Sequence, residues 1–205
     1  MVPVPSPEII AIAFAFIVGI TLHEFAHAWA ANELGDPTAR YAGRLTLNPI
    51  AHLDPIGTVL VPALLVLTGS RFIFGWAKPV PINPYNFRDR RRGIILVSLA
   101  GPVGNLVIAT AAAMLYRLLG PADQSLALVL VWMVFINVFL AFFNLIPVPP
   151  LDGSKVLAGL LPGRQEWLIY LEKYGMIILL LLIFTGLVGR LVEFVVLPLA
   201  YFLLG

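Results

Sequence analysis

Long apolar stretches separated by short polar segments dominate this chain. The longest cover about residues 7–34, 93–119, 125–146 and 174–189, and they approach or exceed the roughly 20 residues that a helix needs to cross a bilayer. A further apolar stretch, 191–204, contains Glu193 and Pro198, and the pattern leaves open whether it spans. The pattern predicts an all-α polytopic integral membrane protein with four or more transmembrane helices.

Shorter segments predict additional elements. Asp54 and Pro55 introduce an apolar run of about 13 residues, too short for a comfortable span, so we expect a short re-entrant segment over 55–69. Arg40 to Leu47 alternates loosely between polar and apolar residues, which predicts a small membrane-associated β element. Leu151 to Leu161, after three closely spaced prolines, predicts a short helix at the membrane surface.

The composition agrees with a membrane protein. Hydrophobic residues make up 60% of the 205 residues and charged residues 12%, about half the charged fraction of a soluble domain. This length predicts a single domain over residues 1–205. Cysteine is absent, which excludes disulfides and thiolate metal sites. The net charge of +2 comes from loop arginines, which favours a role in membrane topology and predicts no nucleic-acid partner.

The basic residues also predict an orientation. If segment 55–69 does not cross the bilayer, 11 of the 13 lysines and arginines lie on one side of it. Positive residues concentrate on the cytoplasmic side of membrane proteins. We therefore expect a multi-pass protein of the cell membrane, with the C-terminal half of the first helix and the end of the third stretch both towards the cytoplasm.

The first apolar stretch contains His23-Glu24-Phe25-Ala26-His27. Histidines at i and i+4 lie on one helix face, so their imidazoles can bind the same metal ion, and the glutamate can act as a base towards the attacking water. Polar groups are costly in a membrane helix, which makes the cluster a candidate functional site. The alternatives are histidines bonded to backbone groups, or an ion or proton relay in a transporter.

A hydrolytic metal site of this kind needs a third protein ligand. The candidates are His52, Asp54, Asp152, Glu33 and Asp36. Asp54 precedes a proline at a helix start and is expected to cap that helix, while Glu33 and Asp36 follow the histidines too closely. Asp152 comes after an unwound proline-rich segment that can direct its carboxylate inward, although it can also act as a helix cap. The residues favour Asp152.

Four motifs together resemble the site-2 protease family of intramembrane zinc metalloproteases, in the compact form without a PDZ or other accessory domain. They are His-Glu-Phe-Ala-His at 23–27, Asn-Pro-Ile-Ala-His-Leu-Asp-Pro at 48–55, Gly-Pro-Val-Gly-Asn at 101–105, and Asn-Leu-Ile-Pro-Val-Pro-Pro-Leu-Asp-Gly at 144–153. The resemblance implies one zinc ion bound by His23, His27 and Asp152, with Glu24 as general base. It also implies that Asn144 contacts the substrate or the developing oxyanion.

The resemblance further places His52 and Asn105 near the active site, in contact with substrate or supporting the ligands. Asn105, with Gly101 and Gly104, also indicates close helix packing, and Asn137 is expected to form a hydrogen bond between helices. The implied activity is cleavage of a peptide bond in or near the transmembrane helix of another membrane protein. An edge strand over 40–47 could hold such a substrate unwound by backbone pairing. A catalytically inactive binder of membrane segments is a further alternative, and no sequence pattern fixes an oligomeric state.

Overall fold

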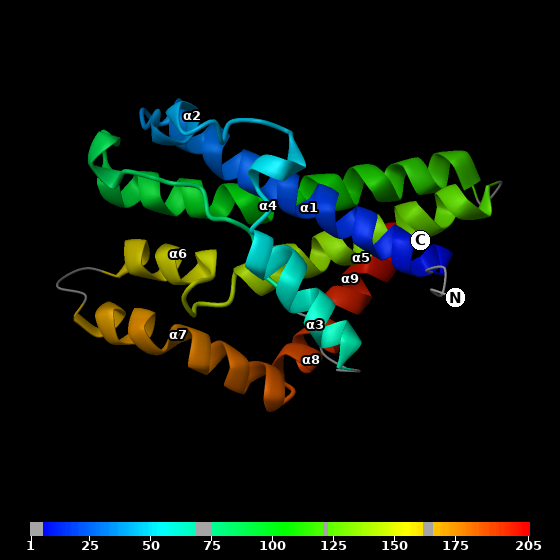
Figure 1. Cartoon of the computed structure of the whole chain (residues 1–205). Coiled ribbons are helices and arrows are strands. Elements are labelled where there is room, and N and C mark those ends of the chain that lie inside the picture. Colours follow the sequence, from blue (N-terminus) through cyan, green and yellow to red (C-terminus); the bar gives the residue numbers. More distant parts are fainter. Residues whose placement is uncertain (1–5, 69–74, 121–122, 162–165) are drawn as a thin grey trace.

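Three long helices form the centre of the protein. A computed structural model describes residues 6–68, 75–120, 123–161 and 166–205, and within these ranges the regular elements are all helical. The helices α1 (Pro7–Glu33), α4 (Arg90–Leu119) and α5 (Gln124–Asn144) pack against one another (Figure 1). The all-α prediction is therefore confirmed for the described residues.

Each of these helices begins at a side-chain cap, which fixes its start in the sequence. Ser6 accepts a hydrogen bond from the Ile9 amide at 3.4 Å, and Pro7 occupies the first helical position. Asp89 accepts one from Arg92 at 3.0 Å, and Asp123 accepts one from Ser125 at 2.8 Å. These acceptors satisfy amides that have no partner within the first turn of a helix.

Among the described residues, four helical segments are long and apolar enough to cross a membrane, as predicted, but the fourth is not the one expected. It is Leu187–Leu204, made of α8 (Leu187–Leu191), η5 (Val192–Val196) and α9 (Leu197–Leu204). The run predicted over 174–189 is interrupted, because α7 (Glu166–Phe184) ends before Gly186, whose φ of 77° does not fit a right-handed helix.

The core between α4, α5 and the C-terminal helical segment consists largely of small and β-branched residues, which allow the helices to approach one another closely. The cluster joins α4 and α5 with the C-terminal helix. Its fully buried members include Ala109, Val134, Val138 and Ala200. Such residues let helix backbones approach closely in a bilayer, where van der Waals contact rather than the hydrophobic effect holds helices together.

The segment after Asp54 forms one short helix, from η2 (Pro55–Leu60) into α3 (Val61–Leu67). Asp54 caps it by accepting from the amides of Ile56 and Gly57, at 3.0 and 2.6 Å, which confirms the predicted capping role. Its length of about 20 Å falls short of the roughly 30 Å hydrocarbon core. The re-entrant path stays a prediction, and residue 69 lies outside the described residues.

The predicted β element is wrong. Residues 38–41 form the helical turn α2 (Thr38–Tyr41), and a turn at 42–43, a bend at 45–46 and irregular backbone follow it up to Leu47. The turn forms because the buried Asp36 carboxylate accepts from the Thr38 amide at 3.1 Å. It also accepts from Asn83 at 2.6 Å and Asn86 at 2.7 Å, which ties this turn to a distant loop. Burial raises the pKa of Asp36, but these hydrogen bonds outweigh burial and hold the pKa below its ordinary value.

The remaining short elements connect the long helices. Two single turns, η1 (Pro49–Ala51) and η3 (Pro84–Asn86), lie in the loops between α2 and α4. The short helix predicted over 151–161 is confirmed as α6 (Asp152–Leu160), which packs against α4. This packing brings the start of α6 next to the histidines of α1.

Candidate metal centre

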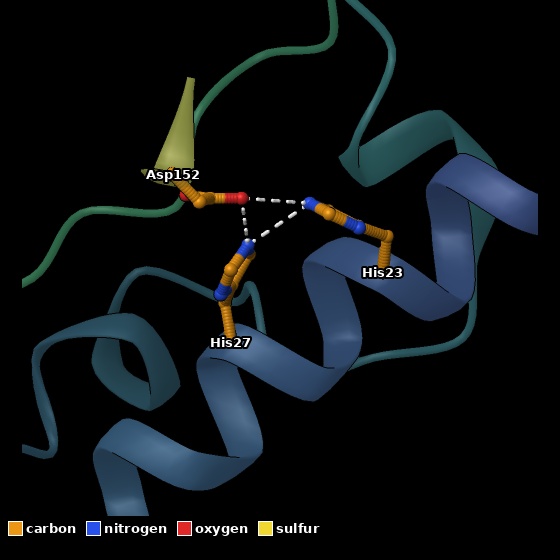
Figure 2. A group of neighbouring side chains, drawn as sticks. All are labelled: His23, His27 and Asp152. Atoms are coloured by element: carbon orange, nitrogen blue, oxygen red, sulfur yellow. Dashed lines mark hydrogen bonds and ion pairs between the residues drawn. The ribbon is translucent and has the colours of Figure 1, made fainter. Parts of the chain in front are cut away.

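Helix α1 presents two buried imidazoles to the same point. His23 and His27 are one turn apart and each is only 6% exposed. Their Nε2 atoms lie 3.0 Å from each other, with the rings nearly perpendicular at an interplanar angle of 87°. Figure 2 shows both rings turned away from the helix axis towards Asp152.

Asp152 completes the cluster from the start of α6. Its Oδ2 lies 3.1 Å from Nε2 of His23 and 3.0 Å from Nε2 of His27 (Figure 2). The alternative role as a helix cap does not fit, because the N-cap residue is Leu151 and no side chain caps this helix. Among the described residues, these three form the group of histidine and acidic side chains placed to hold a metal ion.

The other ring nitrogens determine where the protons lie. Nδ1 of His27 is 2.7 Å from the Val97 carbonyl, which can only accept, so Nδ1 carries the proton. Nδ1 of His23 is 2.6 Å from Oδ1 of Asn105, whose amide nitrogen donates to Gly19 and to Asn137 at 3.1 and 2.8 Å. His23 therefore donates as well. In the neutral imidazoles that bind a metal ion, both Nε2 lone pairs then face the Asp152 carboxylate.

This arrangement fits a metal ion. Three acceptor atoms about 3 Å apart, with no proton between them, repel one another unless a cation lies among them. Tetrahedral zinc with ligands at about 2.0–2.1 Å has ligand atoms roughly 3.3 Å apart, close to the spacing here. Two histidines and one carboxylate leave a fourth position for water or substrate, as hydrolytic zinc sites require.

A lysine holds the other oxygen of the carboxylate. Nζ of Lys155 lies 3.2 Å from Oδ1 of Asp152, one helical turn further along α6. Burial opposes ionisation of Asp152, whereas the Lys155 ammonium favours the ionised form and lowers the pKa of this carboxyl group. The carboxyl group therefore stays ionised, and Oδ2 is the oxygen directed towards the histidines.

The asparagine pair supports the site from α4 and α5. Asn105 and Asn137 are both fully buried, and they join α1, α4 and α5 through hydrogen bonds. The predicted bond between helices at Asn137 is confirmed. Asn105 also reaches His23, so packing and support of the histidine, which the sequence left as alternatives, occur together. Such outer partners fix the orientation of ligating histidines.

Other predicted site residues lie less directly at the cluster. Glu24 follows His23 on α1 and is half-buried. Asn144 ends α5, and its side-chain amide donates to the Leu140 carbonyl at 3.0 Å. Among the described residues, no hydrogen bond joins either side chain to the three-residue cluster. The catalytic roles of both residues therefore stay predictions. The participation of Lys155 was missed, although its position three residues after an acid at a helix start was a usable signal.

His52 lies outside the cluster. It is fully buried, its Nε2 donates to the Thr46 carbonyl at 2.8 Å, and its own carbonyl accepts from Lys78 at 2.9 Å. Arg44, also buried, donates to the carbonyls of Ala51 and Pro79. His52 therefore organises the loops that connect α2 to α4, and the predicted contact with substrate is not tested by this geometry.

Gly101 permits α4 to approach the imidazoles. A Cβ atom at this position would lie 2.5 Å from Nε2 of His27 and 2.7 Å from Nε2 of His23. We predict that Gly101→Ala displaces the rings and lowers zinc affinity by about tenfold or more, comparable to the loss of an outer-shell partner. Chelator competition on the purified protein measures this affinity.

Gly104→Ala provides the matched control for this prediction. It is one turn further along the same helix, but its Cβ would meet the Cβ of Ala26 at 3.2 Å and no ligand atom. This variant should retain zinc affinity within about twofold even if it costs some stability. Unchanged zinc affinity in Gly101→Ala, or equal losses in the two variants, would contradict the assigned contact.

Comparisons with known proteins agree with this centre. A family model described as Peptidase family M50 matches residues 120–186. "Putative zinc metalloprotease YwhC" of Bacillus subtilis is 39% identical over 186 residues, covering 86% of this chain and 81% of the relative. "Putative zinc metalloprotease Rip2" of Mycolicibacterium smegmatis is 32% identical over 177 residues, covering 85% and 67%. No solved structure matches the chain significantly.

These similarities cover most of the chain, and they include the region of Asp152 within the match to the family model. The predicted family, the enzyme class and the zinc cofactor are therefore confirmed. With four helices in its described part that are long and apolar enough to cross a membrane, the chain is a multi-pass membrane protein. It belongs to peptidase family M50, the site-2 protease family, and is a zinc metalloprotease.

Proposed function

We propose that this metalloprotease hydrolyses a peptide bond within or near the transmembrane helix of another membrane protein. The observation that carries the proposal is the position of the cluster. Two of its three members lie on α1, a 27-residue helix long and apolar enough to span the bilayer. The third comes from α6, packed against the spanning helix α4. A substrate within the bilayer can therefore reach these residues without leaving the membrane.

We propose a role for each residue at or near the cluster. His23, His27 and Asp152 hold the metal, and Asn105 and the Val97 carbonyl keep both Nε2 lone pairs directed at it. Zinc bound there supplies a Lewis acid that lowers the pKa of water and polarises a carbonyl group. Glu24 takes the proton of the attacking water and returns it to the leaving amine. Asn144 donates a hydrogen bond to the negative charge that develops on the carbonyl oxygen.

We propose that residues 1–205 form a single domain that carries these residues. Zinc-loaded protein in liposomes, supplied with a designed transmembrane substrate, tests the activity. Cleavage that disappears on chelation and returns with zinc supports the proposal. Zinc-dependent ion flux without cleavage would favour the relay, and zinc binding without either activity would favour an inactive binder of membrane segments.

The orientation of the protein gives a second test. We propose that it lies in the cell membrane with the metal centre towards the cytoplasmic side and with segment 55–69 re-entrant. The chain has no native cysteine, so single cysteines report accessibility without background. Cysteines at Arg90 and Lys155 should react with an impermeant reagent from the cytoplasmic side, and one at Asp123 from the other side. Labelling of 90 and 155 from opposite faces would mean that segment 55–69 crosses the bilayer.

A further inference from the structure

A cavity of about 670 Å³ adjoins the metal centre between α4, α6, the 80–84 loop and α7. On α4 it is lined at positions 90, 91, 94, 97 and 98, which share one helix face. On α6 it is lined at positions 154, 155, 158 and 159, starting two residues after Asp152. Figure 1 shows these two helices side by side, with α7 beneath α6.

The inner end of the cavity reaches the metal centre. Val97 lines it, and the carbonyl of Val97 accepts the hydrogen bond from His27. Lys155 also lines it while its ammonium contacts Asp152. The outer end lies at Arg90, eight residues before Ser98 on α4, which corresponds to about 12 Å along a helix. The cavity therefore runs from residues that contact the metal ligands to the start of α4.

The outer end of the cavity carries positive charge, and contacts with neighbouring residues hold its two arginine side chains in place. The Arg90 guanidinium lies over the Tyr85 ring, 4.1 Å from its centroid, and its side chain is exposed. Arg91 donates to the carbonyls of Gly159 and Leu160 at the end of α6, which holds this wall in place. Among the described residues, the lining contains one acidic side chain, Glu172 on α7, together with the basic Arg90, Arg91 and Lys155. Between the two ends the walls are apolar, formed by Val80, Ile82 and Ile94.

We propose that this cavity binds an extended stretch of the substrate that carries an acidic side chain about four residues from the scissile bond. The proposal rests on the proposed function. An extended chain advances about 3.3 Å per residue, so the roughly 12 Å between the two ends corresponds to about four residues. The apolar walls accommodate the intervening side chains, and the exposed Arg90 guanidinium at the outer end pairs with the carboxylate. The site thus favours substrates with acidic residues where the helix leaves the bilayer.

A substrate series tests the spacing and the charge. Designed transmembrane substrates carry Glu, Gln or Lys four residues to either side of the scissile bond, and a second set carries the same residues at eight. For wild type, kcat/KM should favour Glu over Lys at four residues about five- to twentyfold, mainly through KM, because rim charges act on association. The effect should be at most about twofold at eight residues, beyond the reach of Arg90.

Charge reversal at Arg90 identifies the binding residue. Arg90→Glu should reverse the preference towards the Lys substrate, and Arg90→Gln should abolish it. Arg92→Glu is the matched control, because Arg92 lies in the same helical turn but lines a different cavity, with Glu33 and Phe87. That variant should keep the wild-type preference.

Binding to zinc-loaded Glu24→Gln protein supplies a readout that does not require cleavage. The same order of affinities for the Glu, Gln and Lys substrates is expected there. Equal affinities, or a preference unchanged by Arg90→Glu, would overturn the proposal and leave the cavity as a path for solvent only. Absence of cleavage by wild type with charge-selective binding intact would instead contradict the proposed function and not this inference.

Discussion

Glu24→Gln is expected to keep its zinc and to lose peptide cleavage by about 10²–10⁴-fold, the range that general acid–base catalysis contributes. Glutamine has nearly the same size and hydrogen-bonding capacity, but it cannot accept the proton of the attacking water. Glu24 is not part of the cluster formed by His23, His27 and Asp152, so the metal ligands stay intact. The loss should appear in kcat more than in KM, because the proton is transferred in the transition state.

Zinc content, thermal unfolding and cleavage of a membrane-embedded substrate are measured in the same preparation. Glu33→Gln serves as the matched control, because it makes the same chemical change at the end of the same helix. It should cleave at close to the wild-type rate. Near wild-type cleavage by zinc-loaded Glu24→Gln would remove Glu24 from the mechanism. A further expected result is that membranes containing this variant accumulate the substrates that the wild-type protein cleaves.

The sequence predicts the parts of this protein that depend on local patterns. The helix start at Asp54 follows from capping chemistry, and the structure confirms it. The proximity of His23 and His27 follows from helical periodicity alone. Of the five candidates for the third metal ligand, the sequence favours Asp152, because a proline-broken backbone can turn its carboxylate inward. In the structure, Asp152 is the residue that contacts the two histidines.

Errors arise where distant contacts decide the local structure. The alternation over 40–47 favoured a strand, but Asp36 holds the preceding turn through hydrogen bonds that reach Asn83 and Asn86. The apolar run over 174–189 contains no charge, yet Gly186 divides it and the spanning helix begins at Leu187. In both cases hydrophobicity alone does not report where the backbone turns.

Support of the metal ligands is also invisible in the sequence. The Val97 carbonyl is a backbone atom 70 positions from His27, and no residue type identifies it in advance. Asn105 was expected near the site, but its bond to His23 depends on how α4 packs against α1. The close approach at Gly101 depends on the same packing. The ligands are therefore predictable from motifs, whereas the contacts that orient them require the folded structure.

Replacement of any one ligand is expected to remove zinc, whereas replacement of His52 should not. His23→Ala, His27→Ala and Asp152→Ala each eliminate one of the three atoms that meet within 3.1 Å. Their zinc affinity should fall by more than the roughly 10- to 100-fold that loss of an outer-shell partner costs. Asp152→Asn should lose nearly as much, because it keeps the shape of the side chain but removes the negative charge that balances the ion.

His52→Ala is the discriminating control, because His52 is a buried histidine that bonds to Thr46 and lies outside the cluster. This variant removes a loop contact, so its thermal stability should fall while zinc stays bound at close to the wild-type affinity. Chelator competition and unfolding curves on the same samples separate these two effects. Zinc loss in His52→Ala together with full zinc occupancy in Asp152→Ala would mean that the third ligand comes from the loop after α2. The carboxylate of α6 would then be a partner of the histidines and of Lys155 rather than of the metal.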